Sequence, residues 1–459
     1  MKRTRTAQPR LLKVAALAAA GALVLSACGQ ADNLDDEPAA DDDSAIDAEP
    51  ADDADEVGDE GDAEEVTIRF SWWGSDIRHQ MNQDLIDAFQ EEYPHIQVQP
   101  DYTDWGGYWD KLATQTAGGD APDVLMQEER YLREYASRGV LANLHDYDID
   151  LSQIDDSLVE SGEFDGSLWG IATGVNVRVM IADEQVFADA GVDFPDDTTW
   201  TWDAYAEAVE AVSANSEAGV YGTQEFGFIE SDLQIWLRQH GQELWDENGD
   251  IGFDAELMAE RWQMSLDLIE SGAAPPATES VERSAAGVEG TFIANHEAGV
   301  STYWTNNLET LSSASGRPLT LMRYPGETEF ERTGVFLKPA MALSMAADTD
   351  HPEEAALFID YMLNSETAGD ILLSDRGLPA NNEVRAQIMD QLSDSEQQAA
   401  EFIEEVTPEI VDAYPSPPRG AGEVAAVMAR LNEEVLFGQK DPMDAAEEFI
   451  AEASEITGD

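Results

Sequence analysis

Many residues of this chain could do chemistry, but they do not stand in the spacing of a known catalytic or metal site. The 459 residues include 96 Asp and Glu, six His and one Cys. With so many carboxylates, a pair that resembles the acid and base of a glycosidase arises by chance and carries little information. The histidines are scattered, and the chain has no His-Glu-x-x-His motif, Gly-Lys phosphate loop or cysteine nucleophile. The sequence therefore predicts a protein that is not an enzyme, with no catalytic residue, metal site or cofactor.

The composition excludes further classes of protein. With 24 Lys and Arg the formal net charge is −72, yet the chain holds 11 Trp, 12 Tyr and 15 Phe, too many for a disordered acidic chain. Nucleic-acid binding is excluded because a phosphate backbone requires a basic surface, and the charge also opposes adhesion to anionic lipid. A chain of this length can bury a large core, and we expect two lobes or domains.

Residues 1–27 have the pattern of a secretory signal peptide. Five bases precede the apolar run Val14–Leu25, which is too short to cross a bilayer as a permanent helix. The run ends in Leu25-Ser26-Ala27-Cys28, which resembles the lipobox of bacterial lipoproteins, where the cysteine is lipidated and becomes the mature N-terminus. We therefore expect a lipid anchor on Cys28 at the extracellular face of the cell membrane. An ordinary cleaved signal peptide with a chance cysteine is the alternative.

The next segment, residues 28–65, is expected to be a disordered acidic tether. Residues 29–65 hold 18 acids and no base, so the segment repels itself and stays extended. A sponge for divalent cations is the alternative, but the acids lack the glycine-anchored spacing of a calcium loop.

The acidic excess continues through the remaining body. Without the five leader bases the charge is −77, and residues 66–459 alone carry −59 with only three lysines, Lys111, Lys338 and Lys440. An acidic, lysine-poor surface stays soluble in concentrated salt, where screening removes self-repulsion. We therefore expect a halophilic source and an unfolding midpoint that rises with added salt.

The first part of the body alternates between strand and helix patterns. Val66, Ile68 and Phe70 alternate with polar residues, which predicts a strand, and an amphipathic helix follows up to Tyr93-Pro94. A second strand at Ile96 to Val98 and a helix at 108–116 come next. Val124–Met126 then forms a short apolar run suited to a buried parallel strand. This alternation predicts a βαβ sheet with parallel strands.

Further elements follow along the chain. Asp165-Gly166 predicts a hairpin turn, Val177–Ala182 a strand, and Thr201 can cap a helix over 202–213. Strands are also expected at 300–304 and 319–324. Helical patterns cover 230–241, 255–271, 284–296, 352–363 and almost all of the last 80 residues.

A series of short motifs resembles the extracellular solute-binding proteins of carbohydrate ABC importers, in the branch of the maltose-binding protein. Each motif is weak alone, but they occur in family order from about 66 to 380. They are Phe70-Ser71-Trp72-Trp73-Gly74, Phe89 to Val98, Tyr108-Trp109-Asp110-Lys111-Leu112, Ala117 to Val124, Gly139-Val140-Leu141, Phe187 to Gly191, Thr199 to Tyr205, His351 to Ile359 and Arg376-Gly377-Leu378-Pro379-Ala380.

The resemblance implies an α/β, two-lobed periplasmic-binding-protein-like fold of type II, with hinge crossovers between the lobes. Lobe 1 would take 66–172 and 326–378, and lobe 2 would take 173–325 and 379–459. The ligand would lie in the cleft between them, outside the carboxyl ends of the strands. The expected function is to bind a mono- or oligosaccharide, close on it, and deliver it as a monomer to the transmembrane subunits of an ABC permease. A lipid-anchored carbohydrate-active enzyme and a binder of a non-sugar solute, such as a peptide or metal, are the alternatives.

A sugar site needs aromatic platforms for C–H faces and planar donors and acceptors for hydroxyls. In lobe 1 the resemblance places candidates after the ends of three strands. They are Trp72, Trp73, Ser75, Asp76, Arg78, His79, Asp104, Trp105, Tyr108, Gln127 and Glu128.

Each of these has a plainer alternative. Trp72 and Trp73 could both pack in the core, although neighbours in an extended segment point oppositely. Asp76 could simply cap its helix. Arg78 could neutralise Asp76 or Glu128 instead of binding adjacent hydroxyls or a carboxylate. The resemblance places Asp104, Trp105 and Tyr108 in a Gly106-Gly107 loop.

In lobe 2 the candidates are Asn176, Trp236, Tyr303, Trp304 and Phe336. Asn176 stands in the first crossover at a position where relatives often have a polar sugar-binding residue. Relatives continue with Tyr-Asn-Lys where this chain has Ile181-Ala182-Asp183, which leaves the local register open. Trp304 is the favoured ring platform, Phe336 would return by the second crossover, and core packing is the alternative for Trp236.

Overall fold

The computed structural model describes residues 65–74, 76–284, 290–330 and 332–458. The signal peptide, Cys28 with its expected lipid anchor, the tether up to residue 64, and Ser75 therefore lie outside the described residues. The chain divides into two units, Met1–Gly61 and Asp62–Asp459, and all described residues belong to the second.

The first sheet has the predicted parallel strands at its centre. Its order is β2-β1-β3-β12-β6, with β1 parallel to β2 and β3, and β12 antiparallel to β3 and β6. The strands are β1 (Val66–Trp73), β2 (Ile96–Thr103), β3 (Val124–Gln127), β6 (Ile171–Ala172) and β12 (Ala342–Met345). Because β12 is distant in sequence, residues near 340 complete a sheet that begins at residue 66.

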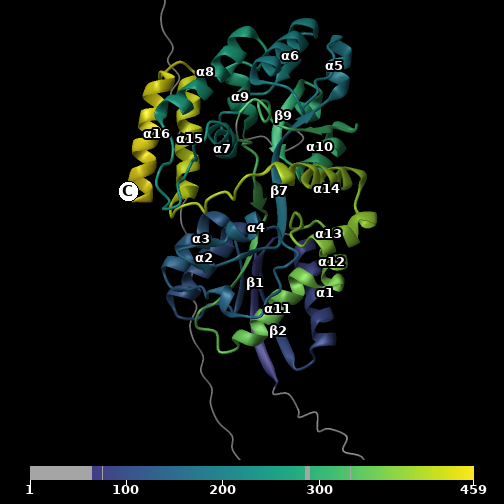
Figure 1. Cartoon of the computed structure of the whole chain (residues 1–459), viewed down its shortest axis with the longest axis vertical. Helices are drawn as coiled ribbons and strands as arrows, with labels where there is room; N and C mark the ends of the chain where they lie inside the picture. The colour runs from purple at the N-terminus through teal and green to yellow at the C-terminus, as the bar shows by residue number, and fades with distance from the viewer. Residues whose placement is uncertain (1–64, 75, 285–289, 331, 459) are drawn as a thin grey trace, which may run out of the picture. The chain divides into compact units, whose positions relative to one another are not determined.

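Helices cover this sheet through one apolar core. Phe89 packs its ring against Phe358 at 4.9 Å, and Phe358 meets Phe70 of β1 at 5.3 Å between centroids. Offset and edge contacts of this kind add to the gain from burial. The helices are α1 (Asp76–Glu92), α2 (Trp105–Ala117), α3 (Glu129–Ser137), α4 (Asp156–Glu160), α11 (Pro352–Asn364) and α12 (Glu366–Leu372) (Figure 1).

The second sheet is built around the long buried strand β7. Its order is β10-β7-β9-β8, and β11 and β13 also pair with β7. The strands are β7 (Gly174–Ala182), β8 (Tyr221–Thr223), β9 (Ala298–Trp304), β10 (Thr320–Met322), β11 (Leu337–Pro339) and β13 (Leu378–Pro379). Every residue of β7 is buried, which fits a largely apolar sequence in which Arg178 is paired with Asp232.

A second apolar cluster, rich in tryptophan, lies among the helices around this sheet and includes Trp202, Trp236, Trp245 and Trp262. Figure 1 shows α15 and α16 beside α8 at one side of this region. Helices α6 (Trp202–Asn215), α7 (Glu230–Gln239), α8 (Ala255–Ser271), α15 (Ala421–Leu436) and α16 (Pro442–Thr457) contribute to this cluster. The remaining helices are α5 (Glu184–Ala190), in a small third cluster, α9 (Ala277–Ser284), and α10 (Asn307–Ser315), α13 (Asn382–Ile388) and α14 (Asp394–Val406), whose buried residues join the first core. Among the described residues, no helix is long and apolar enough to cross a membrane.

The chain passes between the two sheets at short connections. It leaves β6 at Ala172 and enters β7 at Gly174, and it returns between Pro339 of β11 and Ala342 of β12. Gly174 is needed at the first passage, because a Cβ there would lie 2.1 Å from the carbonyl oxygen of Arg376. The architecture is thus α/β with two sheets, as expected, whereas the exact lobe bounds remain a prediction.

Several local predictions are confirmed. The hairpin forms from β4 (Glu163–Phe164) and β5 (Ser167–Leu168), with Asp165 at φ 53° and Gly166 at φ 77° in the turn. The Thr201 hydroxyl caps α6 by accepting a hydrogen bond from the Ala204 amide at 3.1 Å.

Three local predictions are wrong. The Gly106-Gly107 segment is not a loop but the first turn of α2, because the Asp104 carboxylate caps the helix by accepting from the Gly107 amide at 3.0 Å. A helix over 284–296 is also absent from the described part: α9 ends at Ser284, and only a short 3₁₀ turn at 293–295 follows. Residues 410–418 interrupt the C-terminal helices, since Pro415, Pro417 and Pro418 disfavour helix.

Candidate binding pocket

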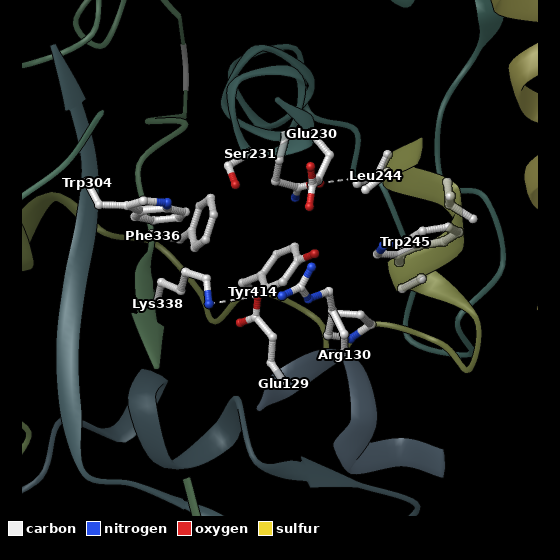
Figure 2. Close-up of a pocket in the computed structure, with 15 residues that line it drawn as sticks. Glu129, Arg130, Glu230, Ser231, Leu244, Trp245, Trp304, Phe336, Lys338 and Tyr414 are labelled. Atoms are coloured by element: carbon white, nitrogen blue, oxygen red, sulfur yellow. Dashed lines mark hydrogen bonds and ion pairs between the residues drawn. The ribbon is translucent and has the colours of Figure 1, made fainter. Parts of the chain in front are cut away.

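One pocket gathers residues from elements of both sheets, and we call it the central pocket. The amino ends of α3 and α7 approach it from opposite sides, and β9, β11 and the segment before α15 form its walls (Figure 2). Its lining residues are Glu129, Arg130, Glu230, Ser231, Gln234, Leu244, Trp245, Trp304, Phe336, Lys338, Tyr414, Pro417, Ala421, Val424 and Ala425.

The charged floor of the central pocket follows from the way α3 begins. Glu128, directly after β3, caps α3 by accepting from the Arg130 amide at 3.0 Å, and its carboxylate also accepts from Arg130 Nε at 2.9 and 3.0 Å. The next residue, Glu129, pairs with Lys338 of β11 at 2.9 Å between Oε1 and Nζ. Polar groups at this strand end are therefore fixed by the helix cap and by two ion pairs.

The aromatic wall consists of three rings from separate parts of the chain. Phe336 stacks on Tyr414 with centroids 4.8 Å apart and planes 23° apart, and it meets Trp304 edge-on at 6.4 Å. Two cations lie over the Trp304 ring, the Arg178 guanidinium at 5.4 Å and the Lys338 ammonium at 5.6 Å from its centroid. Trp304 remains half-buried, so part of its ring is open to the pocket.

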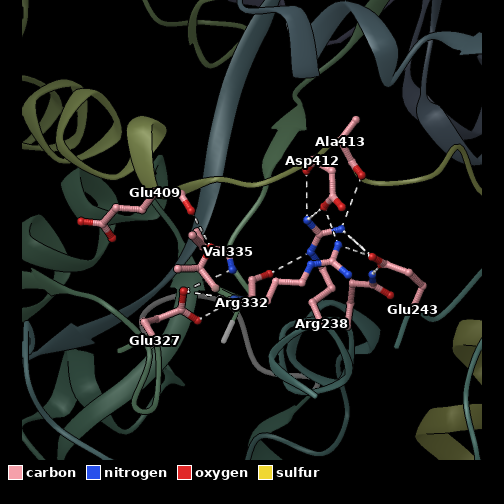
Figure 3. Close-up of polar contacts among 11 residues, drawn as sticks. Arg238, Glu243, Glu327, Arg332, Val335, Glu409, Asp412 and Ala413 are labelled. Carbon is pink, nitrogen blue, oxygen red and sulfur yellow. Dashed lines mark hydrogen bonds and ion pairs between the residues drawn. The ribbon is translucent and has the colours of Figure 1, made fainter. Parts of the chain in front are cut away.

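Tyr414 is held in place by a network around the fully buried Arg238 (Figure 3). Arg238 Nη2 donates to the carboxylate of Asp412 at 2.7 Å and to its carbonyl oxygen at 3.0 Å, Nη1 donates to Glu243 at 3.0 Å, and Nε donates to the Gly334 carbonyl at 3.2 Å. Arg332 bonds the same two carboxylates. A bidentate guanidinium shared in this way restricts the segment that carries Tyr414.

The same segment also reaches the first sheet's helices. Arg133 of α3 donates to the carbonyl of Ser416 at 3.3 Å, and its guanidinium lies 4.4 Å from the Phe164 ring centroid. Residues 410–418 are thus tied to α7 by Arg238 and to α3 by Arg133.

Burial and neighbouring carboxylates shift the pKa values of the pocket groups. Burial raises the pKa of Glu129, the charge of Lys338 opposes this, and Glu128 adds to it. Burial alone would lower the pKa of Arg130, but the charge and hydrogen bonds of Glu128, with Glu230, raise it above its ordinary value. Burial, and then the charges of Glu129, Glu230 and other glutamates, raise the pKa of Tyr414 well above its usual range.

The central pocket is narrow in this conformation, while two neighbouring pockets are wider. It leaves about 30 Å³, space for little more than one water molecule. A side pocket of about 210 Å³ includes Arg178, Ile229 and Tyr303, and Ile229 directly precedes Glu230 of the central pocket. Asn176 lines another pocket of about 250 Å³ beside β13. A saccharide would require the central pocket to widen.

The structure brings some of the predicted site residues to these pockets. Trp304 and Phe336 line the central pocket, Tyr303 lines the side pocket, and Asn176 lines the pocket beside β13. Glu128 supports the central pocket from beneath, through its bonds to Arg130.

Four predicted aromatic residues are instead packed in the core. Trp72 and Trp73 are 1% and 7% exposed, and the Trp72 indole donates to His79 Nδ1 at 3.1 Å. The Tyr108 hydroxyl donates to the Met126 carbonyl at 2.6 Å, and the Trp236 indole donates to the Leu257 carbonyl at 2.9 Å. Protein groups surround all four rings and accept from the donors of Trp72, Tyr108 and Trp236, which favours the packing alternative for Trp72, Trp73 and Trp236.

The polar candidates of the first sheet are also placed. Arg78 pairs with Asp375 at 2.7 Å rather than with Asp76, which is exposed at the first position of α1. Asp104 caps α2, and Trp105, the next residue, is 41% exposed. Gln127, at the end of β3, is fully buried, and its amide has no hydrogen-bond partner within the described structure.

The sequence prediction missed most of the central pocket's polar groups and one of its rings. Arg130 and Glu129 stand directly after the predicted Glu128, so the same strand-end argument could have included them. Lys338 could have been singled out because the body has only three lysines. Tyr414 lies in Tyr-Pro-Ser-Pro-Pro, whose prolines already argue against the helix that was expected there.

The described residues contain no group of three or more His, Cys, Asp or Glu side chains placed to hold a metal ion. Paired charges, hydroxyl donors and aromatic rings are the chemistry that the central pocket offers, and they suit a polar solute with apolar faces.

Comparisons with known proteins agree with this fold. The family model of bacterial extracellular solute-binding proteins matches residues 76–369. A solved extracellular solute-binding protein family 1 member from Alicyclobacillus acidocaldarius has a TM-score of 0.73 and 28% identity, covering 87% of this chain and 100% of that chain. A periplasmic oligogalacturonide-binding protein from Yersinia enterocolitica has a TM-score of 0.74 and 23% identity, covering 85% and 99%.

Curated relatives match over shorter stretches. A putative binding protein of Brucella abortus is 22% identical over 206 residues, which are 44% of this chain and 49% of that protein. The chain thus spans about half the length of the first relatives it matches. An uncharacterized lipoprotein of Streptomyces antibioticus is 22% identical over 329 residues, 69% of this chain and 71% of that protein. The arabinooligosaccharide-binding protein of Halalkalibacterium halodurans is 24% identical over 221 residues, 46% and 48%. Since the family model matches well over half of the chain, this protein belongs to the bacterial extracellular solute-binding proteins.

Proposed function

We propose that the protein binds a sugar or oligosaccharide in the central pocket and delivers it to the membrane subunits of an ABC importer. The observation that carries the proposal is the composition of the central pocket. Three rings from separate elements, Trp304, Phe336 and Tyr414, stand beside hydroxyl and charged donors. Rings suit the C–H faces of a sugar, and guanidinium, ammonium and hydroxyl groups suit its rim.

The mechanism is a shift between an open and a closed form. Glu129 and Arg130 follow a strand of the first sheet, whereas Trp304 ends a strand of the second, so a sugar touching both sets stabilises the form in which they meet. The small volume of the central pocket fits a closed form that must open for entry. The lobes would rotate relative to each other about the passages at 172–174 and 339–342 as the open and closed forms interconvert. These passages would act as the hinges between the lobes expected from the sequence.

Delivery and location complete the proposal. The protein would act as a monomer, anchored by lipid on Cys28 and held off the membrane by the acidic tether, and its closed form would dock on the permease. The lipobox-like Leu25-Ser26-Ala27-Cys28 supports the anchor, as does the similarity to a Streptomyces lipoprotein. Similarity to oligosaccharide-binding proteins supports the ligand class.

Isothermal titration with a panel of neutral and acidic di- and trisaccharides, run in high salt, tests the ligand class. We expect at least one saccharide to bind without being cleaved, and small-angle scattering to show a smaller radius of gyration in its presence. Product formation would support a carbohydrate-active enzyme instead. Binding with an unchanged radius would refute closure, and failure of every saccharide to bind would refute the function itself.

A further inference from the structure

Each cation that faces the central pocket already has a carboxylate partner. Arg130 Nε contacts both oxygens of Glu128, and Lys338 Nζ contacts Glu129 Oε1 at 2.9 Å. Arg178, which lies over Trp304, is 5% exposed and pairs with Asp232 at 2.7 Å. The terminal nitrogens of Arg130 have no hydrogen-bond partner within the described structure. The pocket therefore offers donors to hydroxyls but no unbalanced positive charge.

Three carboxylates, Glu129 and Glu230 in the lining and Glu128 bonded to Arg130 beneath it, stand against two cations, Arg130 and Lys338. Figure 2 shows Glu230 facing Arg130 and Tyr414 from the amino end of α7. Within the described residues, Glu230 makes no ion pair of its own. Burial is the main cause of the raised pKa of the Tyr414 hydroxyl, and the negative charges of Glu129, Glu230 and Glu128 add to it, which is consistent with the carboxylates that Figure 2 shows around this ring.

A ligand with its own carboxylates would meet this negative potential in a confined, poorly solvated space. A uronate carries one negative charge per residue at neutral pH. To bind here it must either accept from the terminal nitrogens of Arg130, beside Glu128 and facing Glu230, or displace Glu129 from Lys338. The free-energy cost of either arrangement is larger than that of the same carboxylate repulsion at the protein surface, because solvent and salt screen charges less in a buried site.

We propose that the central pocket selects by charge: it binds neutral and amino-bearing oligosaccharides and rejects uronate oligosaccharides, and Glu230 is the residue that sets this preference. The inference rests on the proposed function. It separates this protein from the Yersinia neighbour, which is named for oligogalacturonide and shares the fold. Discrimination of this kind comes from a repulsive group as much as from an attractive one.

The test uses probes that match in shape and differ in charge. They are α-1,4-trigalacturonate with its neutral methyl ester, cellotriose with its amino counterpart chitosan trisaccharide, and arabinotriose. The titrations use the whole chain in high salt, because the salt screens the net charge of −59 on residues 66–459. A difference in affinity between charged and neutral probes that remains in high salt then reports on the pocket. We expect the methyl ester to bind at least about tenfold more tightly than trigalacturonate, and chitosan trisaccharide at least as tightly as cellotriose.

Two variants separate the pocket from the general surface charge. Glu230→Gln should reduce the affinity ratio of ester to uronate several-fold, whatever it does to absolute affinity. Glu256→Gln, at an exposed position of α8, removes the same charge outside the pocket and should leave the ratio unchanged.

The outcomes are distinguishable. Trigalacturonate binding as tightly as its ester would overturn charge selection while supporting saccharide binding. Equal shifts of the ratio in the two variants would overturn the role of Glu230. No binding by any probe, neutral or charged, would overturn the proposed function and this inference with it.

Discussion

Two aromatic clusters at the ends of strands differ in what surrounds them. At the end of β1, Trp72 and Trp73 pack with Tyr102, Tyr108 and Trp105, and the Trp72 indole and the Tyr108 hydroxyl donate to protein acceptors. This cluster is the first-sheet aromatic cluster. In the central pocket, Trp304, Phe336 and Tyr414 instead stand beside Arg130, Glu129, Glu230 and Lys338.

The difference shows that a ring in a family motif can be packed against protein without lining the central pocket of the described structure. The Trp72 ring is buried, with 1% of the residue exposed, and its indole N–H donates a hydrogen bond to His79. Part of the Trp304 ring is exposed, and the charged groups of Arg178 and Lys338 lie over it. Burial and polar surroundings, rather than ring type, separate a stabilising aromatic cluster from a binding one.

The largest expected effect is a loss of stability in the first-sheet aromatic cluster. Trp72→Ala should lower the free energy of unfolding by about 3–5 kcal/mol, because it leaves a cavity among packed rings. Urea denaturation measures this. Trp105→Ala, at the exposed edge of the same cluster, is the control and should cost less than about 1 kcal/mol.

Saccharide affinity decides whether the first-sheet aromatic cluster is only structural. Trp72→Phe keeps a ring and should fold, so its affinity can be measured even where Trp72→Ala fails. If Trp72→Phe or Trp105→Ala loses most of its saccharide affinity at unchanged stability, the contrast between the two clusters is wrong.

The sequence was sufficient for the fold because periodicity and cap chemistry are local. The buried β3, the Asp165-Gly166 hairpin and the Thr201 cap follow from neighbouring residues alone. The family motifs then gave the order of the elements. A short segment such as 284–296 failed because its apolar residues do not determine helix without a tertiary partner.

The site was harder to predict because its members meet only in three dimensions. Trp304 and Phe336 were predicted from family position and both line the central pocket, but their neighbour Tyr414 lies far along the chain and is placed by Arg238. The pairing of Lys338 with Glu129 also joins distant segments. Conversely, Arg78 was a candidate ligand contact with neutralisation of Asp76 or Glu128 as the alternative, whereas its partner is Asp375, which no local pattern indicates.

The second prediction concerns affinity in the central pocket. Trp304→Ala should weaken binding of the saccharide that titration identifies by roughly 1–3 kcal/mol, about five- to 150-fold, through loss of stacking. Calorimetry measures the affinity, and thermal unfolding should show a smaller loss of stability than Trp72→Ala does. An affinity equal to wild type would remove Trp304 from the site.

The third prediction compares two tyrosine hydroxyls. Tyr108→Phe removes a buried donor to the Met126 carbonyl and should cost about 0.5–1.5 kcal/mol of stability. Tyr414→Phe removes a hydroxyl without a hydrogen bond in the described structure, so stability should change by less than about 0.5 kcal/mol. Its effect should fall on saccharide affinity. The opposite result, in which Tyr108→Phe loses affinity and Tyr414→Phe loses stability, would mean that the first-sheet aromatic cluster binds the saccharide and that the central pocket is structural.

The smallest expected effect is a pH dependence that belongs to the central pocket alone. Burial raises the pKa of Glu129 above its ordinary 4.5, so the folded protein holds this proton to higher pH than the unfolded chain does. Stability from this group is therefore complete below pH 4.5 and falls as pH rises through the folded pKa. The unfolding free energy of wild type minus that of Glu129→Gln should decrease as pH rises from about 4 to 7.

Tyr108→Phe provides the matched control for this pH dependence. Burial raises the Tyr108 pKa above its ordinary 10.0, so its hydroxyl does not ionise between pH 4 and 7. The difference between wild type and Tyr108→Phe should stay flat over this range. A flat difference for Glu129→Gln as well would mean that the Lys338 pair cancels the burial of Glu129, and the electrostatic contrast between the two clusters would then disappear.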